Sequence, residues 1–162
     1  SIGVAPRFGR VESTLAPGEF GGNMDCVETR EGVTLFLPVW VDGAYLSFGD
    51  IHARQGDGEV NGTALEVTAE VTLTVDVIKG KPVEWPRLEN EEHIMVIGST
   101  RPLMDAVRLA QVGLLEWLVA DYGFHREEAW QVMGQVGTMR IGNVVDPFYT
   151  VVALYPRRYL PA

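Results

Sequence analysis

Apolar and polar side chains alternate without interruption over residues 66–77. Because successive side chains of a β-strand point to opposite faces, this period of two predicts a strand, the clearest one in the chain. One face of the strand is entirely apolar, and the other carries Thr, Glu and Asp side chains. The apolar face consists of Val67, Ala69, Val71, Leu73, Val75 and Val77.

Shorter strand patterns surround this segment. Residues 34–41 form an apolar, β-branched and aromatic run, in which Pro38 favours an edge strand or a bulge. Asp42-Gly43 is typical of a tight turn, so residues 44–48 are predicted to return as the second strand of a hairpin. Glycine occurs 18 times, above average usage, which indicates many turns between strands. Further strands are predicted at residues 93–97, 139–145 and 149–154.

Helical periodicity is confined to a two-helix segment at about residues 102–134. Apolar residues recur at helical spacing from 103 to about 121, and a shorter helix is predicted from about 125 to 134. Strands come first, helices follow and strands close the chain, without the alternation of βαβ units. We therefore expect an α+β, mainly β fold with antiparallel or mixed sheets, organised as a single domain over residues 1–162.

The chain of 162 residues carries a net charge of −9, from 13 basic and 22 acidic residues. Such acidity disfavours binding to phosphate backbones, so nucleic acid is not an expected partner. No apolar run reaches the roughly 20 residues of a membrane helix, and no basic start precedes an apolar segment. A cytoplasmic protein without a membrane partner is therefore expected. The single cysteine, Cys26, excludes an internal disulfide and a zinc ribbon.

Ligand-type side chains concentrate between residues 49 and 59. Asp50 and His52 are two positions apart, so on an extended backbone they share one face. A carboxylate and an imidazole so arranged are typical of divalent-metal sites, where a metal ion lowers the pKa of water to about 7. An ordinary polar turn with a partly buried His52 is the alternative. The glycine-broken loop that follows supplies Gln55, Asp57 and Glu59.

A second candidate segment covers residues 21–26. Two glycines precede Asn23 and Asp25, which suggests a backbone that passes close to a ligand and offers N–H groups to a developing oxyanion. Asp25 would act there as a ligand or as an acid–base group, and a plain turn is the alternative. Cys26 is expected to be structural, because a neighbouring carboxylate raises the pKa of a thiol.

Four blocks of this sequence are similar, in order and spacing, to those of one known family. They are GGNMD at residues 21–25, LFLPV at 35–39, GDIHARQGDGE at 49–59 and GTALE at 62–66. The chain thereby resembles the acetamidase/formamidase family, and the resemblance continues through the helical segment and residues 139–145. It implies a hydrolase that cleaves the C–N bond of a small linear amide, of the formamide or acetamide type, to ammonia and a carboxylate.

The resemblance also implies a metal-associated site, with zinc or calcium as the ion. Carried over residue by residue, it makes Asp25, Asp50, His52 and Glu59 candidates for metal ligands or for the catalytic base. It leaves ligand and base unassigned within this set. The same resemblance makes Asn23 and Gln55 candidates for substrate contact.

Members of the family are longer, and this chain resembles their C-terminal part. Two functions therefore stay open: an amidohydrolase, or a non-catalytic metal-binding or subunit-interaction half that needs an N-terminal partner chain. The chain begins at Ser1 instead of Met, for which three explanations stay open. They are cleavage of a precursor, trimming, and self-cleavage that frees Ser1 as an N-terminal nucleophile. The apolar helix at residues 103–118 favours a homo-oligomer, with a buried core face as the alternative.

Overall fold

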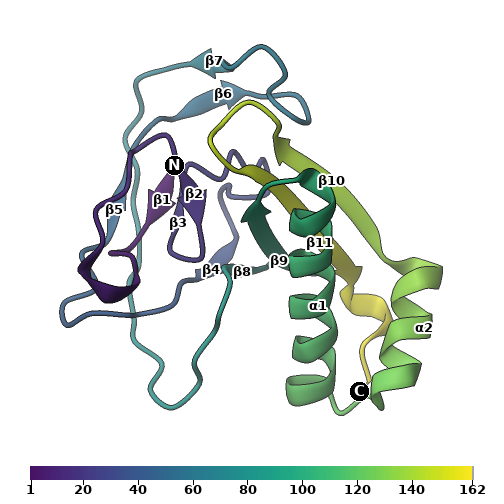
Figure 1. The fold of residues 1–162 in the computed structure, drawn as a ribbon. Helices are drawn as coiled ribbons and strands as arrows, with labels where there is room; N and C mark the ends of the chain where they lie inside the picture. The colour runs from purple at the N-terminus through teal and green to yellow at the C-terminus, as the bar shows by residue number, and fades with distance from the viewer. Residues whose placement is uncertain (162) are drawn as a thin grey trace.

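The computed structural model describes residues 1–161 and is built around a five-stranded antiparallel sheet (Figure 1). Its two central strands, β9 and β11, pair along their whole length and are almost fully buried. This confirms the mainly β, antiparallel fold with two helices. The strands, in spatial order, are β10 (Thr138–Asn143), β11 (Tyr149–Pro156), β9 (His93–Thr100), β8 (Arg87–Glu89) and β4 (Thr34–Phe36).

Two helices, α1 (Leu103–Tyr122) and α2 (Arg126–Val136), cover one face of this sheet (Figure 1). The apolar stripe of α1 packs on alternate residues of β9 and β11, as its helical period predicts. Gly98 in β9 permits this approach, since a Cβ there would lie 2.6 Å from the Ala106 carbonyl oxygen. The buried core on this face includes Ile94, Val96, Ala110, Leu114, Leu118, Val151 and Ala153.

The other face of the sheet supports the first part of the chain. Because strand side chains alternate, Met95, Ile97 and Val152 point away from the helices and pack against Met24 and Cys26. A second sheet lies next to this cluster, in the order β2, β3, β1, β5. Its strands are β1 (Ile2–Gly3), β2 (Pro17–Gly18), β3 (Gly21–Gly22) and β5 (Ser47–Phe48), while β6 (His52–Arg54) and β7 (Leu65–Glu66) form a separate pair.

The predicted hairpin of residues 34–48 is wrong. The first strand ends at Phe36, two residues before Pro38, which cannot donate to a ladder. Its partner is β8, whereas β5 pairs with β1. A turn does form around Asp42-Gly43, so the local signal is present, but distant strands outcompete the neighbouring one.

The alternating segment is the largest departure from the predicted structure. Only Leu65–Glu66 is a strand, and residues 67–82 lie in no element of the described chain (Figure 1). Every residue from 65 to 82 is exposed. A strand needs hydrogen-bonding partners, and within residues 1–161 no strand pairs with residues 68–77. Over the same residues, no helix combines the length and apolar character needed to cross a membrane.

Candidate functional site

Gln55 connects the two segments that carry the predicted site residues. Its side-chain amide donates to the Asp25 carbonyl oxygen at 2.8 Å and to the Gly142 carbonyl oxygen at 3.0 Å. The Oε1 atom of the same side chain lies 2.9 Å from His52 Nδ1. Gln55 thus fixes the loop after β6 against the 23–25 segment, while its predicted contact with substrate stays a prediction.

His52 occupies the centre of the site. Its Nε2 lies 3.2 Å from Asp50 Oδ1 and 3.1 Å from Glu66 Oε2, and its Nδ1 lies 4.0 Å from Glu59 Oε1. Burial by itself would lower the pKa of His52, but hydrogen bonds to Gln55 and Asp50 raise it overall. The ring is therefore held between acidic groups that favour its protonated form.

Asp50 is the acidic group that these contacts hold in its charged form. Burial raises the pKa of Asp50, yet hydrogen bonds from Ser1 and His52 outweigh this and bring the pKa below its ordinary value. The Ser1 hydroxyl lies 3.1 Å from Asp50 Oδ2 and also within hydrogen-bond distance of Asn23 Oδ1. Asp50 adopts a positive φ of 55°, which turns the chain sharply just before β6.

Asp25 is the most perturbed carboxyl of the site. Burial raises its pKa from 3.8 to about 9, helped by the neighbouring carboxyl of Asp146 and by the charge of Glu59. Asp25 Oδ2 is buried and has no hydrogen-bond partner within the described residues. The Asp146 carboxyl can bond to it only when one of the two groups carries a proton. Asp25 therefore needs either a proton or a cation to be stable where it lies.

Glu59 reaches the site from a loop that is pinned to the main sheet. The Gly58 N–H donates to the Ile141 carbonyl oxygen at 2.8 Å, and the Gly58 carbonyl oxygen accepts from the Val144 N–H at 2.9 Å. Gly58 and Glu59 both have positive φ, and this conformation turns the Glu59 side chain inward, where it is 8% exposed. Burial raises the pKa of Glu59, although the charge of His52 opposes the rise.

Asp57, which the sequence placed in the same glycine-broken loop as Gln55 and Glu59, bonds to Arg140 and is not among the acidic partners of His52. Its carboxylate accepts hydrogen bonds from Arg140 Nε at 3.1 Å and Nη2 at 2.5 Å. Arg140 also donates to Glu28 at 2.9 Å, so one guanidinium ties the site loop and the 26–30 turn to β10. Asp57 acts as a support of the loop.

The structure adds Asp146 and Glu66 to the predicted residues. Asp146 is buried, accepts a hydrogen bond from Asn23 Nδ2 at 2.9 Å and follows β10, so only the tertiary fold brings it near Asp25. Glu66 is the direct cross-strand partner of His52 in the β6–β7 pair. Glu66 belongs to the alternating segment, so the sequence indicated only a strand residue there. Asp146 precedes a proline, a pair typical of a turn, so nothing in the sequence indicated a site residue there.

Two groups of side chains in the described chain have the composition and spacing to hold a metal ion. Asp25, Asp50 and His52 form one, and His52, Glu59 and Glu66 form the other, with ligand atoms within 4.8 Å of one another in each. The unpartnered Asp25 oxygen and the raised pKa of two carboxyls fit such an ion, because a divalent cation would offset the crowded negative charge. Carboxylate oxygens are ligands for both zinc and calcium, and imidazole nitrogen is a ligand for zinc.

Other predicted features lie outside this chemistry. Gly21 and Gly22 form a strand with partners on both sides, and a Cβ on either would meet a backbone oxygen within 2.6 Å. Close backbone packing thus accounts for these glycines, and neither the oxyanion site nor the plain turn describes them. Cys26 is buried, which raises its pKa to about 11 and fits the structural role expected of it.

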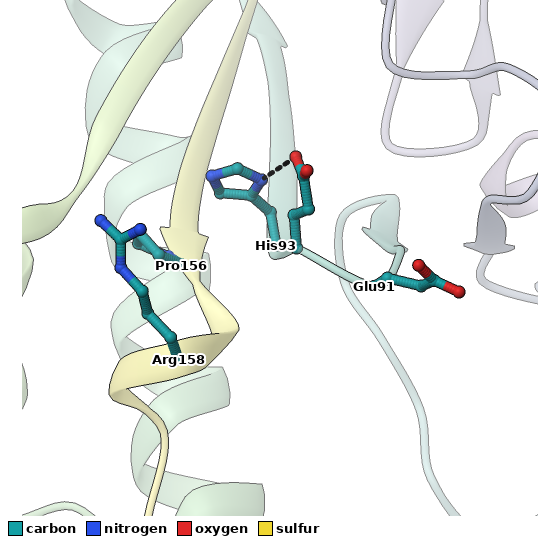
Figure 2. Close-up of a pocket in the computed structure, with 5 residues that line it drawn as sticks. Glu91, His93, Pro156 and Arg158 are labelled. Atoms are coloured by element: carbon teal, nitrogen blue, oxygen red, sulfur yellow. Dashed lines mark ion pairs between the residues drawn. The ribbon is translucent and has the colours of Figure 1, made fainter.

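His93 is likewise separate from the site. Figure 2 shows it at the start of β9, in a surface pocket that it shares with Glu91, Glu92, Pro156 and Arg158. Its Nδ1 lies 3.9 Å from Glu92 Oε2. This pocket has no residue in common with the group around His52, so His93 offers a matched control for the site histidine.

A profile described as the Acetamidase/Formamidase family matches residues 9–157. The chain belongs to this family. It is 35% identical over 144 residues to an acetamidase of Mycolicibacterium smegmatis, a match that covers 75% of this chain and 35% of that protein. A putative formamidase of Schizosaccharomyces pombe is 44% identical over 62 residues, covering 38% of this chain and 15% of that protein.

Solved acetamidases share the fold over the whole chain. A crystal structure from Yersinia enterocolitica superposes with a TM-score of 0.97 at 45% identity, covering 100% of this chain and 49% of that one. Another, from Bacillus halodurans, gives a TM-score of 0.91 at 34% identity, covering 98% and 53%. The chain therefore spans about half the length of these solved family members and about a third of the M. smegmatis acetamidase.

Proposed function

We propose that this chain carries the catalytic residues for hydrolysis of a small linear amide to ammonia and a carboxylate, assisted by a divalent metal ion. The observation that carries the proposal is the convergence of Asp25, Asp50, Glu59 and Glu66 on His52 in a member of the acetamidase/formamidase family. Relatives named acetamidase and formamidase support the reaction class.

Glu59 is our candidate for the catalytic base. Burial raises its pKa, which makes it a stronger proton acceptor than an exposed Glu. Its carboxylate lies beside the imidazole of His52. It would take a proton from the attacking water and pass it to the amide nitrogen as the C–N bond breaks. One water is consumed, the acyl carbon keeps its oxygen, and the nitrogen leaves as ammonia.

His52 and Asp50 would hold the metal ion together with Asp25, the first of the two ligand groups. Such an ion would act as a Lewis acid on the amide carbonyl and would lower the pKa of water toward about 7. Gln55 would orient His52 through its Nδ1, leaving Nε2 for the ion. Asn23, which donates a hydrogen bond to Asp146, would contact the amide group of the substrate.

The test compares His52→Ala and Glu59→Gln with the matched variants His93→Ala and Glu91→Gln from the pocket of Figure 2. Ammonia release from formamide and acetamide is measured for the chain alone and with the half of the Y. enterocolitica acetamidase that it does not match. We expect the site variants to lose about 100-fold or more and the controls to keep full activity.

Metal content provides a second readout. The purified chain should bind about one equivalent of zinc or calcium, and His52→Ala should abolish this binding while its circular dichroism stays unchanged. Full ammonia release by both site variants would refute the assignment. The wild-type chain could instead bind the metal but release no ammonia, either alone or with the second half. That result would make the non-catalytic metal-binding function the correct one.

A further inference from the structure

Residues 67–78 have the alternating pattern of a strand but belong to no helix or sheet of the described chain. Within the described chain, the last backbone hydrogen bond of this region is from Val67 N to Ile51 O at 3.0 Å, and residues 68–82 make none to other backbone groups. We propose that this segment is the docking surface for the half of the protein that corresponds to the unmatched half of the solved acetamidases, and that it pairs there as a β-strand.

The side chains of the segment are those of a buried strand, yet every one of them is exposed. Val71, Leu73 and Val75 are 42%, 40% and 67% exposed, and the apolar face continues on both sides of them. Soluble proteins rarely leave an unpaired apolar strand open, because its free N–H and C=O groups and its apolar face recruit another chain. β-branched and aliphatic residues at every second position suit strand addition to a sheet edge.

The size of the relatives identifies the occupant. The Y. enterocolitica acetamidase reproduces the whole of this chain with a TM-score of 0.97, and that match occupies 49% of its length. The conformation of residues 67–78 is therefore compatible with a fold about twice as large. We infer that the additional half of that fold would supply the main-chain partners and the apolar cover that residues 67–78 lack within residues 1–161.

A second copy of this chain fits less well. Within residues 66–77 the only charged side chains are Glu66, Glu70 and Asp76, all acidic. Pairing two such strands brings like charges together across the ladder, which destabilises it. The net charge of −9 on each chain adds repulsion between two copies.

Docking at this surface would also affect the candidate site. Glu66 is the last residue of β7 and directly precedes the docking surface of residues 67–78. Across the β6–β7 pair, its Oε2 lies 3.1 Å from His52 Nε2. A partner that orders residues 67–78 therefore holds Glu66 in place against His52. The surface itself is defined by exposure and backbone pairing, so it stands whether or not the site hydrolyses amides.

The experiment uses this chain together with the unmatched half of the Y. enterocolitica acetamidase, co-expressed as a separate polypeptide. Light scattering after size exclusion should show a one-to-one complex, and hydrogen exchange should show protection of amides 68–78 that is absent in the chain alone. If the separate half is insoluble, the two polypeptides are joined by a flexible linker, and the same amides are measured.

Two double variants separate the apolar face from the polar face. Val71→Lys with Val75→Lys should weaken the complex by about tenfold or more, because each lysine replaces a buried methyl-bearing side chain with a charge. Thr72→Lys with Thr74→Lys, on the opposite face of the same exposed segment, should change affinity by no more than about threefold. Both pairs are exposed in the chain alone, so its fold is expected to be unaffected.

Three results would overturn the proposal. Equal exchange of amides 68–78 in the fusion and in the chain alone would show that the segment does not pair. Equal weakening by both double variants would show that the apolar face is not the one covered. Protection of the same amides in a homodimer of this chain would assign the surface to a second copy.

Discussion

Residues 87–161 and residues 1–86 bury their apolar side chains to very different extents. Of the buried hydrophobic residues in the described chain, all but five lie between Leu88 and Tyr155, and those five lie between Val4 and Cys26. The later region has its own helix-on-sheet core, with β9 and β11 almost fully covered. The earlier region instead leaves most of its large apolar side chains exposed, including Phe8, Val11, Val60 and Val75.

This difference shows that the two regions are stabilised by different kinds of contact. The later region buries one face of its sheet under its own helices, as a small α+β unit should, while the other face packs on Met24 and Cys26 of the earlier region. The earlier region has strands of two or three residues and a site held by hydrogen bonds, and it is tied to β10 by Arg140 and by backbone hydrogen bonds of Gly58. The candidate site lies where the two regions meet, so its geometry depends on both.

The largest expected effect is in the helix–sheet core. Leu118→Ala removes a fully buried side chain from α1 and should lower the free energy of unfolding by about 2–5 kcal/mol. The matched change Val75→Ala, at an exposed position of the earlier region, should lower it by less than about 0.5 kcal/mol. Urea unfolding of the two variants measures both. Similar losses would contradict the division into two regions.

The next effect concerns the buried carboxyl of Asp25. Because its pKa is raised from 3.8 to about 9, the folded state keeps a proton that the unfolded state releases, so stability falls as pH rises through that window. Asp25→Asn stays neutral and should avoid this loss. With chelator present, we expect Asp25→Asn to be more stable than wild type at pH 9 by about 1–3 kcal/mol, and by less at pH 5.

Urea midpoints at the two pH values measure the Asp25 effect. A constant difference between wild type and variant from pH 5 to 9 would contradict the raised pKa. With saturating zinc or calcium, wild type should be more stable than Asp25→Asn, because the bound cation neutralises the Asp25 carboxylate in place of the proton.

The smallest effect is expected for the connection between the regions. Arg140→Ala removes hydrogen bonds to Asp57 and Glu28 and should cost about 0.5–1 kcal/mol, less at high salt because Arg140 is partly exposed. Arg126→Ala breaks an exposed ion pair with Glu116 inside the later region and should cost less than about 0.5 kcal/mol. Thermal unfolding in low and high salt distinguishes the two. Equal, salt-independent costs would show that Arg140 does not connect the regions.

Local sequence patterns predicted the later region well. Both helices, β9, β10 and β11 form at or near the expected residues, because helical period and strand composition act over short stretches that pack on one core. The blocks around Asp25, His52 and Glu59 were also found, since ligand-type residues gather near glycines there. Their hydrogen-bonded arrangement and the participation of Asp146 were not predictable, because residues 25, 52, 59 and 146 meet only through long-range pairing.

The sequence by itself determined where helices and strands can form, which ligand-type side chains the chain offers, and that residues 66–77 have one apolar face. Only the tertiary structure decided which strands pair, which carboxyls become buried beside His52, and that the alternating segment finds no partner in residues 1–161. The physical reason is that a strand is completed by hydrogen bonds and apolar cover from elsewhere. The alternation of residues shows which face of a strand is apolar. The rest of the fold decides which strand or helix packs against that face.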